Sequence, residues 1–327
     1  MDRIVLCLFL FICALQSHGQ SVYVCSGSST SKYHIDRNCR GLKSCGSPVK
    51  ETTIALMAKQ RRGACKICSD GVINSVNSMT NNTTNKTSKQ TTVVATMTFN
   101  TAGLELPTTA KGRVSQIIKH IGYTTNYNVS WLIPNWVAYD LTKKEVHGTF
   151  PRPKKPFEPD PLVNGKSAEH GDYTNSGYSR GHMAPAADMK WSEQAMNESF
   201  YLSNISPQIA ELNGGIWERL EDRCRALADE GTVYICCGPI MSPTPKRIGT
   251  NGVAVPSKFF KVLCMQRNGK WQAVGFIMPN STIKGSLFDY AMSVDEVEKV
   301  TGHNFFPSLP DDIEIVVESA WKMKDWQ

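Results

Sequence analysis

Apolar and polar positions alternate in short runs over the C-terminal two thirds of the chain. Four runs rich in Val, Ile, Phe and Tyr are predicted strands, because such residues suit a pleated, half-buried surface; they cover residues 136–141, 233–240, 258–266 and 271–278. Helical spacing predicts helices over residues 191–200, 216–230 and 294–300. Strands in runs, with helices between some of them, favour an α+β fold in which helices flank a central, mostly antiparallel sheet.

The second of these predicted helices carries two different stripes. Its apolar stripe recurs every three or four residues, as a core-facing helix requires, through Ile216, Leu220, Cys224 and Leu227. Residues 213–227 as a whole are predicted to be helical, and a second ridge then places an amide, a carboxylate and a guanidinium along one edge, through Asn213, Trp217, Glu221 and Arg225. An ordinary surface ion pair between Glu221 and Arg225 is the alternative interpretation.

A second segment with candidate functional residues is Tyr-Ser-Arg-Gly-His-Met-Ala-Pro-Ala-Ala-Asp, at residues 178–188. In an extended segment, Arg180 and His182 share one face because they are two residues apart. An arginine fork binds phosphate, and a histidine can exchange a proton near neutral pH. Gly181 permits close approach of a backbone or a substrate. A surface loop with an incidental histidine is the alternative.

Together these segments resemble the DNA/RNA non-specific endonucleases of the ββα-metal, His-Asn type. The resemblance runs in order through residues 136–139, 157–161, the Arg-Gly-His triplet, 202–208, 213–227 and 294–302, and it covers roughly residues 100 to 320. The family usually has an aspartate before the Arg-Gly-His triplet, whereas this chain has Ser179. The resemblance implies a ββα-metal nuclease domain and hydrolysis of phosphodiester bonds in DNA and RNA.

The same resemblance implies roles for individual residues. His182 is expected to act as general base, and Asn213 to bind Mg²⁺ or Mn²⁺, with Glu221 holding one of the metal's waters. Arg180 and Arg225 are expected to offset charge on the phosphate. Asn204 is a candidate for substrate binding or for orienting its loop, and a plain turn amide is an equal alternative.

A basic segment lies just before Phe157, where the family tends to carry a substrate-binding arginine. Its cations, any of which could bind a neighbouring phosphate, are Arg152, Lys154 and Lys155. A solvated cluster in a loop is an equal alternative. A different class of function also stays open at this point, namely a catalytically inert exported protein that only binds nucleic acid.

The N-terminus indicates export. Arg3 precedes an apolar run over residues 4–15, and small residues follow before position 20, which together predict a signal peptide over residues 1–19. The run is too short to cross a bilayer as a helix. A secreted or periplasmic protein is therefore expected, with no membrane attachment after cleavage.

Residues 20–69 are predicted to form a small module held by a metal or by disulfides. Its His-Cys-Cys-Cys spacing resembles the zinc modules appended to some bacterial nucleases, with ligands His34, Cys39, Cys65 and Cys68. A disulfide knot is the alternative. If those cysteines bind Zn²⁺, the mature chain retains an even set able to pair, namely Cys25, Cys45, Cys224, Cys236, Cys237 and Cys264.

Charge is concentrated in this module. Residues 20–69 hold nine Lys and Arg against one Asp and one Glu, a balance of +7, which equals the formal net charge of the chain. We hypothesise that the module tethers polyanions through phosphate contacts, the alternative being a merely soluble basic knot. Deleting it should then flatten the salt dependence of DNA binding, and an unchanged slope would exclude the tether. A flexible linker rich in Ser, Thr and Asn is expected over residues 70–98, before a nuclease domain at 99–327.

Overall fold

The structure is a computed structural model that describes residues 21–25, 32–34, 37, 42, 45, 48–53, 63–64, 99–154 and 157–326. The chain divides into two compact units, Met1–Val93 and Val94–Gln327. The division falls within the segment expected to be a linker, 70–98. That segment and the expected signal peptide, 1–19, lie outside the described residues.

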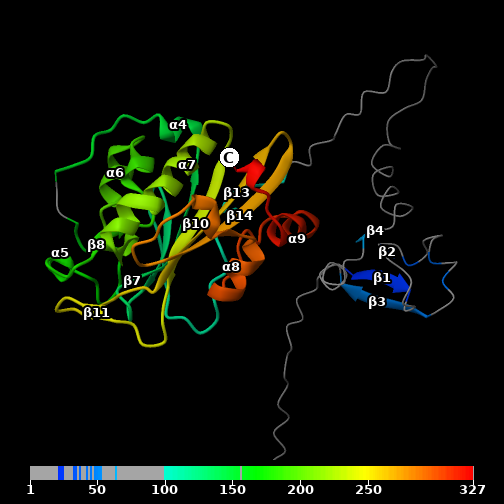
Figure 1. The fold of residues 1–327 in the computed structure, drawn as a ribbon, viewed down its shortest axis with the longest axis horizontal. Helices are drawn as coiled ribbons and strands as arrows, with labels where there is room; N and C mark the ends of the chain where they lie inside the picture. Colours follow the sequence, from blue (N-terminus) through cyan, green and yellow to red (C-terminus); the bar gives the residue numbers. More distant parts are fainter. Residues whose placement is uncertain are drawn as a thin grey trace, which may run out of the picture. The chain divides into compact units, whose positions relative to one another are not determined.

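A seven-stranded, fully antiparallel sheet forms the centre of the larger unit (Figure 1). Its strands follow the order β15-β14-β13-β10-β7-β6-β5. Their bounds are Ala291–Met292, Lys270–Pro279, Lys258–Arg267, Val233–Ile240, Ile133–Leu141, Thr124–Asn128 and Gln116–Lys119, in the same order. The four predicted strands are β7, β10, β13 and β14, so the sequence located the middle of the sheet and its antiparallel character is confirmed.

Helices cover both faces of this sheet. On one face α7 (Glu218–Ala228) packs with Val137, Tyr139 and Ile235. On the other, α8 (Val294–Thr301) and α9 (Asp311–Ser319) pack with Trp136, Ala138 and Cys236. Figure 1 shows α7 on one side of the sheet and α8 and α9 on the other. Because side chains alternate across a strand, burial on both faces explains why β10 is apolar almost throughout.

Shorter elements complete the larger unit. The remaining α-helices are α4 (Lys143–Val146), α5 (His170–Tyr173) and α6 (Glu193–Glu198). Single turns are η2 (Ala186–Met189), η3 (Leu202–Asn204), η5 (Leu287–Tyr290) and η6 (Met323–Asp325), and η4 (Leu212–Trp217) is π-helical. Two antiparallel ribbons lie outside the main sheet, β8 (Ser179–His182) with β9 (Ile205–Gln208) and β11 (Arg247–Ile248) with β12 (Val253–Ala254). No helix among the described residues is both long and apolar enough to span a bilayer.

The structure corrects the helix expected over residues 213–227. Its apolar stripe is buried as expected, since Ile216, Leu220, Cys224 and Leu227 are at most 2% exposed. The regular α-helix begins only at Glu218, however, because the preceding turn is π-helical and Gly215 leaves helical dihedral angles. Trp217 consequently lies in the core rather than on the edge expected to carry Asn213.

The smaller unit contains two short two-stranded sheets. The strand β1 (Ser21–Cys25) pairs antiparallel with β3 (Val49–Thr53), and β2 (Lys32–Tyr33) pairs in parallel with β4 (Gly63–Ala64). A disulfide joins Cys25 and Cys45, so the alternative of disulfide stapling is realised at this pair.

That disulfide does not test the expected zinc site, because none of the four expected ligands takes part in it. His34 is buried, and burial lowers its pKa. Its backbone pairs with that of Tyr23. Cys39, Cys65 and Cys68 lie outside the described residues.

Of the six cysteines considered able to pair, only Cys25 and Cys45 form a disulfide in the part of the chain that the structure describes. Cys224, Cys236, Cys237 and Cys264 are free thiols buried in the larger unit. They behave there as small apolar side chains, since the inward-facing positions that they occupy belong to the two hydrophobic cores.

Candidate active site

His182 lies at the end of the ribbon β8–β9, which fixes its direction. The ribbon pairs His182 with Ile205 and Gly181 with Ser206. The imidazole packs between two aromatic rings, with ring-centroid distances of 5.2 Å to Phe157 and 5.3 Å to Phe200. These contacts hold the ring in one orientation, which is what a group taking part in proton transfer requires.

Gly181 is needed for the packing of this ribbon. The side chain of Gln208, which is fully buried, occupies the space that a Cβ on Gly181 would need. The close approach expected at this glycine is therefore made by a protein side chain. Glycine here lets β8 lie directly on the side chain of Gln208, and this contact fixes the position of the neighbouring His182.

Asn204 braces the segment that follows His182. It is fully buried, its Oδ1 accepts from the Ala184 amide at 2.8 Å, and its Nδ2 donates to the carbonyls of Ala184 and Ser199, both at 2.9 Å. With its amide fully used and no exposed surface, Asn204 has no contact to offer a substrate. The substrate-binding role expected for it is corrected to a positioning role.

Arg180 shares a face of β8 with His182, as the spacing predicts, since its guanidinium lies 5.8 Å from the centre of the Phe157 ring. The guanidinium also donates to the carbonyl of His170 at 2.7 Å and to Oγ1 of Thr174 at 3.2 Å. These contacts attach α5 to the ribbon. Arg180 is not among the residues that line the cleft described below, so its role beside the reacting phosphate stays a prediction.

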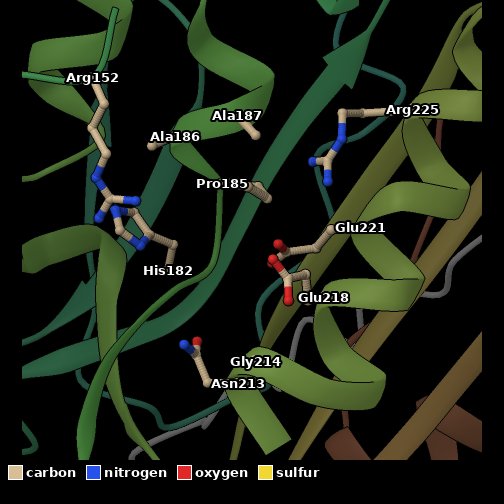
Figure 2. Close-up of a pocket in the computed structure, with 10 residues that line it drawn as sticks. All are labelled: Arg152, His182, Pro185, Ala186, Ala187, Asn213, Gly214, Glu218, Glu221 and Arg225. Carbon is tan, nitrogen blue, oxygen red and sulfur yellow. The ribbon is translucent and has the colours of Figure 1, made fainter. Parts of the chain in front are cut away.

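A cleft of about 170 Å³ opens beside His182. It is lined by Arg152, His182, Pro185, Ala186, Ala187, Asn213, Gly214, Glu218, Glu221 and Arg225 (Figure 2). Five of the candidate site residues therefore meet here: Arg152, His182, Asn213, Glu221 and Arg225. Of the three candidate substrate cations, Arg152 lines the cleft, Lys154 is exposed outside it, and Lys155 lies outside the described residues.

Asn213 reaches the cleft from the π-helical turn η4. The sequence placed it on one continuous α-helix with Glu221, but the wider turn and the break at Gly215 separate the two. Both side chains nevertheless face the same space (Figure 2). A local π-helical turn is a recurrent way to aim one side chain off the regular helical register.

Two carboxylates enter the cleft from the first turn of α7. Figure 2 shows Glu218 and Glu221 with their carboxylates side by side, between His182 and Arg225. Burial raises the pKa of Glu221 to about 8, and the Asp188 and Glu218 charges act in the same direction. Glu218 was missed by the sequence argument, although its spacing of three residues from Glu221 already places both on one helix face.

Arg225 is held by a buried carboxylate that the sequence argument did not assign. Its guanidinium lies 2.6 Å from Oδ1 of Asp188, a fully buried side chain, and 2.5 Å from Oδ1 of the exposed Asp222. Tyr139 donates to the other oxygen of Asp188 at 3.1 Å. Burial alone would lower the pKa of Arg225, but the Asp188 carboxylate raises it, so the cation persists at any working pH.

A buried lysine lies beneath this group. Lys261 of β13 has no exposed surface, its Nζ has no hydrogen-bond partner among the described residues, and that atom lies 4.9 Å from the centre of the Trp217 ring. Its charge acts to lower the pKa values of Glu221 and Asp188. The sequence signal for this residue is a lone lysine within a run of apolar residues, at 259–265.

His182 is neutral in this environment. Burial, assisted by the positive charge of Arg152, lowers its pKa to about 3. Its Nε2 is buried without a hydrogen-bond partner, whereas the side chain as a whole is partly exposed. The ring is therefore open to the cleft through Nδ1.

The side chains around the cleft fit a hard divalent cation. Asn213, Glu218 and Glu221 present amide and carboxylate oxygens, the ligands that Mg²⁺ and Mn²⁺ prefer. Burial disfavours the charged form of Glu221, and a cation bound beside it would favour that form again.

A central antiparallel sheet with a histidine-bearing β-ribbon and a helix that supplies an amide and carboxylates is the architecture of the ββα-metal nucleases. The structure is similar to a solved structure titled "Crystal structure of the EndoG/EndoGI complex: Mechanism of EndoG inhibition", with a TM-score of 0.57, 29% identity, and coverage of 60% of this chain and 88% of that one. The chain belongs to the DNA/RNA non-specific endonuclease family, whose model matches residues 102–312.

Curated relatives agree with this family. Nuclease EXOG, mitochondrial, of Danio rerio is 39% identical over 207 residues, 58% of this chain and 60% of that protein. Endonuclease G, mitochondrial, of Bos taurus is 32% identical over 211 residues, 60% of this chain and 71% of that protein. The chain thus spans about 60% of the length of the EXOG relative.

These relatives overturn the expectation of export. Both are named as mitochondrial proteins, as is Nuclease 1 of Schizosaccharomyces pombe. The prediction of a secreted or periplasmic protein rested on one short apolar run in residues 1–19, which is a compositional pattern. The comparison rests instead on about two hundred aligned residues of the domain itself.

Proposed function

We propose that this protein hydrolyses phosphodiester bonds in DNA and RNA, with His182 as general base. The observation that carries the proposal is that His182 opens on the same cleft as the oxygens of Asn213, Glu218 and Glu221 and the cations of Arg152 and Arg225. Membership of the nuclease family supports the reaction class.

In this proposal Nδ1 of His182 takes the proton of the attacking water, because Nε2 is buried. The lowered pKa keeps the imidazole unprotonated and therefore able to accept. A phosphate bound beside Arg152 would offset that cation and raise the pKa of His182 towards the range suited to base catalysis. General base catalysis contributes about 10² to 10⁴ in rate.

Asn213, Glu218 and Glu221 would hold a divalent cation, for which Mg²⁺ or Mn²⁺ is proposed. When bound, such an ion supplies a Lewis acid that stabilises charge on the phosphate and the leaving oxygen. Arg225, fixed by Asp188, would bind the same phosphate through its remaining donors, and Arg152 would bind the neighbouring one.

The test is digestion of plasmid DNA and of RNA by the purified protein with Mg²⁺, with Mn²⁺ and with EDTA. We expect cleavage of both substrates, loss of cleavage in EDTA, and a fall of about 10² to 10⁴ in His182→Ala. His147→Ala is the matched control, because His147 is exposed and paired with Asp229. Full activity in His182→Ala would overturn the assignment of the base, and wild-type binding without cleavage would favour the inert nucleic-acid-binding alternative.

The names of the relatives favour a mitochondrial location for this protein. Fractionation of cells that express the full chain with a C-terminal tag tests this location. Recovery with the mitochondrial fraction is the expected result, and recovery elsewhere would contradict it.

A further inference from the structure

Three carboxylates converge between the two helices on the face of the sheet opposite the cleft. Asp295 and Glu298 lie on α8, and Glu318 lies on α9. One carboxylate oxygen from each lies within 4.8 Å of the other two. Among the described residues, these are the three acidic side chains whose oxygens lie close enough together to hold one metal ion. The two helices pack Val297 and Val317 into the hydrophobic core on this face, and the acidic cluster shares no residue with the nuclease cleft.

Glu318 distinguishes this group from an ordinary acidic surface. Its side chain is 4% exposed, and its Oε1 is buried with no hydrogen-bond partner in the part of the chain that the structure describes. It also lies one residue before the end of α9, where the helix dipole disfavours a negative charge. A buried carboxylate oxygen without a hydrogen-bond donor lowers the stability of the folded state. A bound ion would supply the partner that the described residues do not.

The cluster has no ion-pair partner among the described residues. No lysine, arginine or histidine of the described residues lies within ion-pair distance of Asp295, Glu298 or Glu318. Glu298 uses Oε1 to accept from the Phe305 amide at 2.8 Å, which holds its carboxylate in place. Burial raises the pKa of Glu318 to about 10, and the charges of Glu298, Glu314 and Asp295 act in the same direction.

We infer that Asp295, Glu298 and Glu318 form a structural site for a divalent cation of the calcium type. All three ligands are carboxylates, and Ca²⁺ binds six to eight oxygens at flexible angles, so water and backbone oxygens can complete its shell. A divalent cation here offsets two of the three negative charges and links α8 to α9. The alternative is that the carboxyl groups share protons and bind no ion.

Calcium binding is measured on the full-length protein after EDTA treatment and dialysis. At neutral pH, CaCl₂ is titrated by calorimetry, and thermal unfolding is followed with and without it. A hundredfold excess of Ca²⁺ over its Kd should raise the Tm by roughly 5–10 °C, because the ion binds only the folded state.

Three variants assign that response to a site. In Glu318→Gln the calorimetric signal and the rise in Tm should be lost, while the calcium-free protein stays folded, since a buried charge has been removed. Asp312→Asn changes the same charge at an exposed position of α9 and should keep the response. Asn213→Ala, which alters the nuclease cleft, should keep it as well.

The inference fails if the wild-type protein shows no calcium response, if Glu318→Gln keeps the full response, or if Asn213→Ala abolishes it. The last result would locate the calcium in the cleft. Because the readout is binding and unfolding rather than cleavage, it is independent of the proposed nuclease activity.

Discussion

At the scale of single residues, the site depends on a buried ion pair that supports a partly exposed cation. Asp188 is fully buried and forms an ion pair with Arg225. A buried ion pair of this kind contributes little net stability. Removing one partner, however, leaves the other charge buried and unpaired, which is strongly destabilising. Positioning of Arg225 is therefore the function that the pair serves.

Asp188→Asn should lower the free energy of unfolding by about 3 kcal/mol and the kcat of nucleic-acid cleavage by at least tenfold, because Arg225 loses its anchor. Denaturant unfolding and cleavage kinetics measure the two effects. Asp222→Asn is the control, since Asp222 also contacts Arg225 but is exposed and should cost under about 1 kcal/mol. Equal effects of the two substitutions would show that Asp188 does not hold Arg225 in position more firmly than Asp222 does.

Lys261 supports the same site from beneath. In Lys261→Met, the buried cation that lowers the pKa of Glu221 is lost, while the contact with Trp217 is kept by an apolar side chain. We expect the Mg²⁺ concentration for half-maximal cleavage to rise about tenfold, equivalent to one pKa unit at Glu221. Lys258→Met, at the exposed start of the same strand, should leave it unchanged. An unchanged metal dependence in Lys261→Met would exclude this role.

At the scale of elements, the position of His182 is set by the contact between β8 and β9. Gly181→Ala places a methyl group against the buried side chain of Gln208. The expected result is a loss of about 1–3 kcal/mol in stability, as for overpacked cores, and a fall in kcat as His182 shifts. Gly171→Ala is the matched control, because nothing lies within 4 Å of its added Cβ. Thermal unfolding and cleavage assays compare the two, and wild-type behaviour of Gly181→Ala would show that β8 accommodates the methyl group.

At the same scale, regular elements followed from the sequence and irregular ones did not. The strands β7, β10, β13 and β14 and the helices α7 and α8 have periodic apolar patterns, which are local properties. The π-helical turn η4 has no such pattern: Gly215 leaves helical dihedral angles, and the next two residues, Ile216 and Trp217, are buried in the core. The short strands β5, β6 and β9 also escaped prediction, because pairing rather than composition makes them strands.

At the scale of the whole molecule, stability is expected to fall on acidification. Burial lowers the pKa of His303 to about 4, with Arg113 acting in the same direction, and its Nδ1 accepts from the Ala110 amide at 3.0 Å. The unfolded chain, with an ordinary histidine pKa of about 6.5, binds the proton first. The stabilising contribution is therefore complete above pH 6.5 and is lost as the pH falls towards 4.

Near pH 5 this single histidine should cost about 2 kcal/mol of unfolding free energy relative to neutral pH. His303→Asn keeps an acceptor for Ala110 without titrating, so it should lose that part of the pH dependence. His147→Asn, at an exposed histidine, should keep it. Urea unfolding measured across this pH range decides the question, and identical slopes in His303→Asn and the wild type would refute it.

The sequence by itself determined the family, the central antiparallel strands and the chemical identity of His182, Asn213, Glu221 and Arg225, because periodicity and residue spacing are written locally in the chain. Only the tertiary structure decided which candidates meet. Burial and complete hydrogen bonding assign Asn204 to the support of its loop, and the guanidinium of Arg180 donates to the carbonyl of His170 in α5. Asp188 and Lys261 join the site, and Glu318 meets Asp295 and Glu298 elsewhere, because folding brings together residues that are far apart along the chain.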